Sequence, residues 1–349
     1  MSYLRNVWYM AAWSHELVPG KMLARTLLDT PVALVRHDDG TPSALLDRCP
    51  HRFAPLTAGR LEDGRIICGY HGLGFDSSGA CVLNPHGPVL RNMAVPAFPL
   101  VETHRALWIW LGDPERADPA LVPDLSYLST APDTAFSCGQ ILARGNYELF
   151  VDNLLDLSHT DYLHPTTLGG GAISKVKPAV VVHEDYVDVT WSMAGTQPPP
   201  FVARLMGESV GEIDLVTRVR WFPASVIQLT GSTTPAGQSE EEGLQNFNAH
   251  ILTPETSSST HYFFAATRNF KVDDAELNTM LAAMREHIFS AEDKPMIELI
   301  QERMGTADFW SLKPLLLPVD SGPVQVRRKL KSLIDAEQLA SAPREQEPA

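Results

Sequence analysis

Two short stretches of the chain each place a histidine just after a cysteine. They are Cys49–His51 and Cys68–His71, and residues 52–67 lie between them. Thiolates and imidazoles are ligands of zinc and of iron–sulfur clusters. The chain has only four cysteines in 349 residues, too few for a disulfide scaffold. The sequence therefore predicts one metal site whose ligands are Cys49, His51, Cys68 and His71.

The spacing within this set favours an iron–sulfur cluster over zinc. A zinc ribbon uses Cys-x₂-Cys twice, and a zinc finger uses a cysteine pair followed by a histidine pair. Here each stretch supplies one cysteine and then one histidine. That order suits a two-iron cluster with both thiolates on one iron and both imidazoles on the other, with a structural zinc site as the alternative. Cys81 and Cys138 have no such partners and are expected to be small buried thiols.

A second candidate metal site lies in residues 146–162, which predict a well-buried helix because apolar residues fall on several of its faces. Asp152 and His159 would be buried there too and would need partners. His164 follows His159 by five residues, which on a straight helix separates their directions by about 140°. Pro165 disfavours helical angles at His164. We therefore expect the helix to end or unwind between the two histidines, so that both can reach one ion.

Two histidines and one carboxylate form the ligand set of oxygen-activating ferrous enzymes. In the helical stretch 277–304, Phe289 and Asp293 fall on an apolar stripe, an expensive place for a solvated carboxylate. Asp293 is therefore the candidate third ligand. Glu286 and Glu292 fall on other faces and are expected to be exposed. By spacing alone, a histidine on an apolar helix is more often a hydrogen-bonded core residue than a metal ligand.

The elements that must position these residues fall into two parts. Short β-rich runs separated by turn signals such as Asp63-Gly64 predict a β unit to about residue 112, and a proline-containing linker follows. The rest predicts strands, a helix or helix pair over 277–304 with a break or kink at Pro295, and a helix over 323–339. We expect domains at 1–115 and 116–349. The strands are expected over 22–28, 32–35, 44–46, 65–67, 106–111, 187–191, 215–221, 226–229, 250–252 and 261–265.

Composition narrows the function classes. Hydrophobic residues make up 44% of the chain and charged residues 20%, the net charge is −14, and no block of Lys and Arg occurs, which argues against a nucleic-acid partner. No apolar run reaches the ~18–20 residues that span a bilayer, and the first residues lack the apolar core of a signal peptide. We expect no membrane association and a cytoplasmic location.

With these motifs, the chain resembles the Rieske non-haem iron oxygenases. It is most similar to the group that contains vanillate O-demethylase, dicamba monooxygenase and toluenesulfonate methyl-monooxygenase. The fold implied is α+β: an N-terminal all-β Rieske [2Fe-2S] domain and a C-terminal catalytic domain in which an antiparallel sheet grips a long helix. The similar stretches are 5–9, 48–52, 69–72, 151–159, 162–164, 250–256, 268–270 and 292–294.

The resemblance also implies a role for each candidate residue. Asn153 matches an asparagine near the mononuclear iron, and Asp156 matches an aspartate that bridges His71 of one subunit to His159 of its neighbour, in a head-to-tail homotrimer. His250 matches a substrate-contacting histidine, although an ordinary hydrogen-bonded strand residue is an equal alternative. The implied cluster ligands are Cys49, His51, Cys68 and His71, and the implied ligands of the Fe(II) ion are His159, His164 and Asp293.

The function implied is that of the terminal oxygenase of a multicomponent system. A separate flavin and iron–sulfur NADH reductase would supply electrons, since the chain has no dinucleotide fingerprint. With O₂, the enzyme would O-demethylate a methoxylated aromatic acid and release formaldehyde. Hydroxylation of an aryl methyl group or ring carbon is the nearest alternative. More distant alternatives are a zinc-stabilised binding module without redox activity and a bare Rieske electron carrier, which would leave about two-thirds of the chain without a role.

Overall fold

The computed structural model describes residues 3–168, 173–198, 200–207, 210–223 and 226–341. A mobile loop expected at Gly169–Gly171 and a disordered tail expected at the C-terminus lie outside the described residues, apart from Ser341. The chain divides into two compact units. The N-terminal unit holds residues 5–124 and 253–257, and the C-terminal unit holds residues 125–252 and 258 onwards together with the first four residues.

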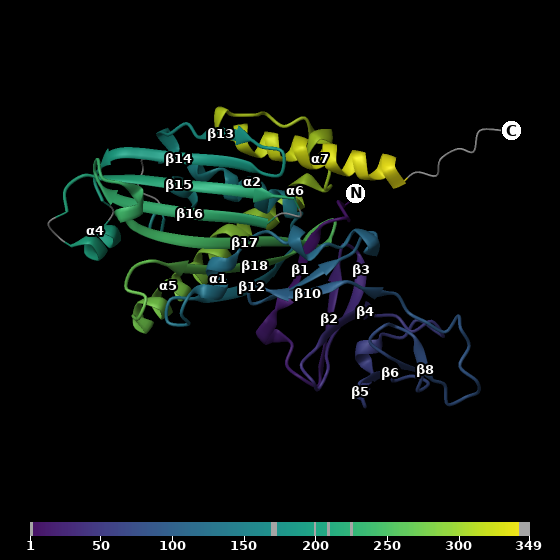
Figure 1. Cartoon of the computed structure of the whole chain (residues 1–349). Helices are drawn as coiled ribbons and strands as arrows, with labels where there is room; N and C mark the ends of the chain where they lie inside the picture. The colour runs from purple at the N-terminus through teal and green to yellow at the C-terminus, as the bar shows by residue number, and fades with distance from the viewer. Residues whose placement is uncertain (1–2, 169–172, 199, 208–209, 224–225, 342–349) are drawn as a thin grey trace. The chain divides into compact units, whose positions relative to one another are not determined.

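The N-terminal unit is built from β-strands in three small sheets (Figure 1), with strand orders β1-β11-β10, β2-β3-β4-β9 and β5-β6-β7-β8. Turn chemistry sets their hairpins: Asp63 and Gly64 both have positive φ, as a two-residue type I′ turn requires. The strands are β1 (Trp8–Trp13), β2 (Lys21–Leu27), β3 (Thr30–Arg36), β4 (Pro42–Leu46), β5 (Arg60–Glu62), β6 (Arg65–Ile67), β7 (Gly74–Phe75), β8 (Cys81–Leu83), β9 (Ala97–Phe98), β10 (Leu100–Thr103) and β11 (Ala106–Trp110).

The C-terminal unit contains a seven-stranded antiparallel sheet of order β12-β18-β17-β16-β15-β14-β13. Together with the β-sheets of the N-terminal unit, it confirms the α+β expectation. The strands are β12 (Ser137–Ala143), β13 (Ala179–Val182), β14 (Val187–Thr196), β15 (Ile213–Phe222), β16 (Val226–Pro235), β17 (Leu244–Thr256) and β18 (Ser259–Arg268). The α-helices are α1 (Ser126–Thr130), α2 (Tyr147–Leu155), α3 (Thr160–Leu163), α4 (Pro200–Met206), α5 (Ala275–His287), α6 (Lys294–Met304) and α7 (Ser321–Ser341).

Helix α7 packs over β13 and β14 on one face of this sheet, and α2 packs against α7 (Figure 1). Strand register puts Val189 and Trp191 on the same face as Val219 and Trp221, and all four are almost completely buried. The Trp191 indole donates a hydrogen bond to the carbonyl of Leu155, the last residue of α2, at 3.3 Å. Apolar burial on this face therefore fixes the end of α2, where the candidate metal site begins.

The stretch expected to be one helix over 146–162 is interrupted earlier than the sequence suggested. Helix α2 ends at Leu155, and Asp156 has extended angles, φ −104° and ψ 92°. The Asp156 carboxylate accepts a hydrogen bond from the Ser158 amide and so caps a 3₁₀ turn, Leu157–His159. An aspartate competes well with helical backbone bonding in this way. The interruption therefore precedes both histidines, and His164, before Pro165, also leaves the helix with φ −117° and ψ 43°.

The second long helical stretch contains no break at Pro295. Residues Ile288–Asp293 form a π-helical segment that joins α5 to α6 without interruption. Pro295 occupies the first turn of α6, where its missing amide hydrogen matters least. The wider π turn accommodates the proline in a continuous helix, and such segments are frequent at functional sites. Among the residues that the structure describes, no helix is both long and apolar enough to cross a bilayer.

Candidate functional site

The two Cys/His stretches fold into loops of the same design, one after β4 and one between β6 and β7. In the first, the Cys49 amide bonds the Ala54 carbonyl at 2.9 Å, and the Phe53 amide bonds the Cys49 carbonyl at 2.9 Å. The second loop repeats this pattern from Cys68, with bonds of 2.8 and 3.0 Å. The fifth residue of each loop, Phe53 or Gly72, has a positive φ. Local backbone hydrogen bonds therefore give the two loops the same conformation.

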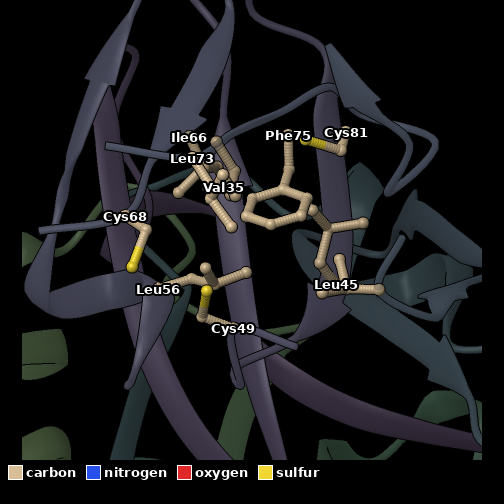
Figure 2. Packing of buried hydrophobic residues seen from close by; sticks show 10 residues of the cluster. Val35, Leu45, Cys49, Leu56, Ile66, Cys68, Leu73, Phe75 and Cys81 are labelled. Atoms are coloured by element: carbon tan, nitrogen blue, oxygen red, sulfur yellow. The ribbon is translucent and has the colours of Figure 1, made fainter. Parts of the chain in front are cut away.

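The loops separate thiols from imidazoles. Cys49 and Cys68 are buried in the apolar cluster of the N-terminal unit, where their sulfur atoms point into the same space and away from Cys81 (Figure 2). The rings of His51 and His71 lie 4.4 Å apart, and both residues are more exposed than the cysteines. Burial, together with the neighbouring Cys68 thiol, raises the pKa of Cys49. A positively charged iron bound here would favour the thiolate form.

This arrangement fits a two-metal cluster better than one zinc ion. Tetrahedral zinc brings four ligand atoms within about 4 Å of one another. In the described part of the chain, the one set of three or more His, Cys, Asp or Glu ligand atoms within 4.8 Å of one another is in the C-terminal unit. The loop residues instead form a thiol pair and an imidazole pair, as expected for a cluster with sulfur ligands on one iron and nitrogen ligands on the other.

That set in the C-terminal unit consists of His159, His164 and Asp293. The Nε2 atoms of His159 and His164 lie 3.6 and 3.1 Å from Oδ1 of Asp293. The Asn153 side-chain amide reaches the same carboxylate oxygen at 3.1 Å and Nε2 of His159 at 3.2 Å. The structure thus brings Asp293 to two histidines that precede it by more than 120 residues in the chain, with Asn153 beside them.

The opposite ring nitrogens of both histidines are held by hydrogen bonds. His159 Nδ1 donates to the carbonyl of Asp156, and His164 Nδ1 donates to the Glu292 carboxylate at 2.8 Å. A proton fixed on Nδ1 leaves Nε2 as the free lone pair, so both rings present the nitrogen that faces Asp293. Metal-binding histidines need this arrangement, because the ring nitrogen that faces the metal must carry the lone pair. The residues present therefore fit an iron ion.

Electrostatics keep the third ligand ionised. Burial alone would raise the pKa of Asp293, but the adjacent imidazoles of His159 and His164 outweigh it and lower the pKa to about 2. Burial lowers the pKa of His164, and its bonds to Asp293 and Glu292 raise it by more. Two imidazoles and one carboxylate on one side, with room left for further ligands, are the donors of an oxygen-activating ferrous site.

Glu292 corrects an expectation from the sequence. It was expected on an exposed face, yet its side chain is 16% exposed and also accepts a hydrogen bond from the Thr167 hydroxyl at 2.9 Å. The π-helical turn is the cause, because its wider spacing turns two consecutive residues, Glu292 and Asp293, toward His164. No periodicity analysis based on 3.6 residues per turn could have found this second partner.

Asp152, whose burial suggested a partner, is paired with a cation and not with a metal. Arg327 of α7 contacts the Asp152 carboxylate at 2.7 Å and the Glu148 carboxylate at 2.8 Å. Asp156, one turn further on, lines a pocket of ≈540 Å³ together with Asn153 and His159. This pocket opens the site toward the surface next to Asp156.

His250 lies on β17 and is buried. Its Nδ1 atom pairs with the Tyr262 hydroxyl at 2.7 Å, and its ring stands edge-on to Phe289 at 5.4 Å. Burial, aided by the positive charge of Arg285, lowers the pKa of His250 to about 3, so the ring is neutral. Nε2 has no hydrogen-bond partner among the described residues. His250 is therefore a hydrogen-bonded strand residue, and its Nε2 atom is still available to contact a substrate.

Comparison with known proteins is consistent with both sites. Residues 7–99 match the family described as the Rieske [2Fe-2S] domain, and residues 143–336 match the one described as the vanillate O-demethylase oxygenase C-terminal domain. The oxygenase component of dicamba O-demethylase from Stenotrophomonas maltophilia is 38% identical over 98% of this chain and 100% of its own length. The oxygenase component of chloroacetanilide N-alkylformylase from Rhizorhabdus wittichii is 38% identical over 96% and 97%.

A solved structure agrees along the whole fold. Dicamba monooxygenase with non-haem iron and dicamba superimposes with a TM-score of 0.84 at 35% identity, covering 97% of this chain and 100% of that one. The Rieske match overturns the zinc-module alternative, and the second match, over residues 143–336, overturns the bare electron carrier.

Proposed function

Because this chain belongs to the Rieske non-haem iron oxygenases with a C-terminal domain of the vanillate O-demethylase type, we propose that it removes a methyl group from a methoxylated aromatic acid. The observation that carries the proposal is the convergence of His159, His164 and Asp293, with Nε2 of both histidines turned toward the Asp293 carboxylate. As an oxygenase component, it would act with a separate NADH reductase. Because NADH is generated inside the cell, we propose a cytoplasmic location.

Each group of residues has an assigned task. Cys49 and Cys68 hold one iron of a [2Fe-2S] cluster, and His51 and His71 hold the other, which their separation into two pairs supports. His159, His164 and Asp293 hold a single ferrous ion, and Asn153 orients the carboxylate of Asp293 through its amide. When bound, the cluster stores electrons one at a time and the ferrous ion activates O₂.

The overall reaction balances with O₂ and two electrons. One oxygen atom inserts into a C–H bond of the methoxy group, and the other leaves as water after taking up two protons and two electrons. The hydroxymethyl ether formed is a hemiacetal, which collapses to a phenol and formaldehyde. The protein's part is to hold the ether against the apolar wall of Phe289, Phe264 and Tyr262 and to exclude water there. Nε2 of His250 is placed to contact the substrate.

We propose that Asp156 connects the two centres between subunits of a head-to-tail homotrimer, a ring of heterologous contacts that closes. Its backbone carbonyl holds His159, and the residue lines the ≈540 Å³ pocket beside the ferrous site. On the cluster loops, Tyr70 and Phe53 are 59% and 69% exposed. Exposed aromatic residues are typical of surfaces that bind another protein, so a neighbour's cluster loops are the occupant proposed for the pocket.

The test is product analysis with a set of methoxybenzoates. The purified protein, loaded with cluster and iron, is supplied with NADH and a ferredoxin-type reductase, and formaldehyde, phenol and NADH are quantified. The expected result is one formaldehyde and one phenol for each NADH consumed. A hydroxymethyl arene or ring-hydroxylated product without formaldehyde would instead support the alternative, hydroxylation of an aryl methyl group or ring carbon. Full NADH-coupled turnover in His51→Ala would overturn the whole scheme.

A further inference from the structure

Arg285 has no acidic partner among the described residues of the C-terminal unit. It lies in the last turn of α5, and its Nη1 atom donates to the Ser137 hydroxyl on β12 at 2.7 Å. Its Nε and Nη2 atoms have no hydrogen-bond partner among the described residues, and no described carboxylate forms an ion pair with it. By contrast, the enclosed Arg327 contacts two carboxylates, and Arg268 makes four hydrogen bonds.

The guanidinium of Arg285 is surrounded by protein but is still partly accessible to solvent. The residue is half-buried, yet enough protein surrounds the group that burial, followed by the positive charge of Arg268, lowers its pKa to about 10. It is therefore still charged near neutral pH. An enclosed charge with most of its donors unpaired is costly unless an anion binds to it. Such a group is expected where a ligand supplies the missing partner.

Arg285 and the metal ligand Asp293 lie on the same continuous helical stretch, which sets the distance between them. Arg285, Phe289 and Asp293 are spaced by four residues, and the wide turns of the π-helical segment keep such a spacing on one side of the helix. Eight residues of helix span about 12 Å at 1.5 Å per residue, and slightly less through a π turn. A cation, an aromatic side chain and a metal ligand therefore follow one another along a single stripe.

Aromatic residues of the sheet pack against the middle of this stripe, at Phe289. Phe289 packs against Tyr262 and Phe264 at ring distances of 5.3 and 4.9 Å and against His250 at 5.4 Å. The charges of Arg285 and Asp293 both influence the pKa values of His250 and Tyr262. An aromatic wall thus lies between one positive group and one metal ligand.

We propose that Arg285 binds the ionised acid group of the aromatic substrate, through charge-assisted hydrogen bonds from Nε and Nη2. The ring then lies along Phe289, and the opposite end of the substrate reaches His159, His164 and Asp293. This inference rests on the proposed function, in which the substrate is a methoxylated aromatic acid. It adds the residue that binds the charge of that acid, and therefore the direction in which the substrate lies.

Equilibrium binding tests the inference without turnover. Calorimetry on the protein loaded with cluster and iron, without reductase, compares 4-methoxybenzoate with its methyl ester, which has the same ring and ether but no charge. For the unaltered protein we expect the acid to bind about 10- to 100-fold more tightly, the range of a hydrogen-bonded charge. Arg285→Gln should remove this preference while the ester binds as before, and Arg285→Lys should keep part of it.

Arg218→Gln is the matched control. Arg218 lies on β15, on the opposite face of the same sheet, is half exposed and pairs with Glu240. Its loss removes the same charge from the same unit and should leave acid binding unchanged. The inference is wrong if the unaltered protein binds acid and ester equally, a result that needs no variant to fold. It is also wrong if Arg285→Gln, with normal cluster absorption and thermal unfolding, weakens acid and ester alike.

Failure of this inference can be distinguished from failure of the proposed function. Loss of acid binding in Arg285→Gln without formaldehyde from any methoxybenzoate would support the anion site and contradict demethylation. Formaldehyde from the acid and the ester at equal rates, unchanged by Arg285→Gln, would support demethylation and contradict the anion site.

Discussion

The two candidate metal centres are built in opposite ways. The cluster loops come from one segment, residues 49–73, and each is closed by two backbone hydrogen bonds of its own. The ferrous site takes His159 and His164 from the region after α2 and Asp293 from the π-helical segment. The first centre is therefore specified by local sequence, whereas the second exists only when distant elements are packed together. Distant substitutions should accordingly disturb the second centre and spare the first.

The sharpest test of this separation removes one ligand from each centre. His159→Ala should abolish product formation, a loss greater than the roughly 100-fold typical of changes to groups that only support metal ligands. It should leave the cluster absorption and its reduction by NADH and reductase intact, because none of the cluster loops contains a residue of that site. Anaerobic reduction and product analysis measure both.

His51→Ala is the reciprocal variant. It should remove the cluster signal in electron spin resonance and all NADH-coupled turnover, while the protein still binds Fe(II) at His159, His164 and Asp293. Loss of both metals from either variant would contradict the independence of the two centres.

Arg327→Met should damage the ferrous centre from a distance. It leaves the Asp152 and Glu148 carboxylates, whose pKa values burial already raises, without their shared cation. Breaking such a buried pair lowers the free energy of unfolding by about 3–5 kcal/mol. Because Arg327 fixes α2 to α7, we expect iron to be lost at lower urea concentration than the cluster.

Arg218→Met provides the comparison for this effect. Its ion pair with Glu240 is exposed, so the cost should stay within about 1 kcal/mol. Equal shifts of the urea midpoint in the two variants would show that the Arg327 pairs do not hold α2 in place.

Asp156→Asn tests the connection between the centres. Asparagine also caps helical turns well, so the Ser158 bond and the fold should persist. Coupled turnover should fall about 10- to 100-fold, as for other groups that support a metal ligand, while each metal keeps its own spectrum. Asp335→Asn, on the exposed face of α7, should change nothing. A normal rate in Asp156→Asn would contradict the proposed electron path.

Glu292→Gln should have the smallest effect. The amide oxygen can still accept from His164 Nδ1, but it lacks the charge that strengthens this bond. We expect Fe(II) affinity, measured by competition with a chelator, to fall about tenfold. Glu286→Gln changes an exposed carboxylate of α5 that bonds Ser290, and it should leave the affinity unaltered. Equal affinities for the two variants would show that Glu292 does not orient the ligand.

The sequence predicted what local chemistry determines. The turn at Asp63-Gly64 and the restriction that Pro165 imposes on His164 both act within a few residues, so they can be recognised from the local sequence. Strands β1 and β12 were missed for local reasons as well. β1 is buried throughout and shows no alternation, and β12 contains Gly139, where a Cβ atom would meet the Phe264 ring at 2.4 Å.

The rest depends on contacts that spacing does not encode. Arg327 meets Asp152 across 175 residues, and Arg285 meets Ser137 across 148. Neither pairing has a periodic signature, because each follows from how helices pack on the sheet. Glu292 was misplaced because the helix there does not have 3.6 residues per turn.

The π-helical segment also limits how this enzyme can change. A deletion of one residue between Arg285 and Asp293 that left the π-helical turn in place would rotate one of these side chains away from the other by about 100°. An insertion would rotate it the opposite way. New substrates of different length should therefore arise by point substitutions along β16, β17 and β18, while the number of residues between α5 and α6 stays constant.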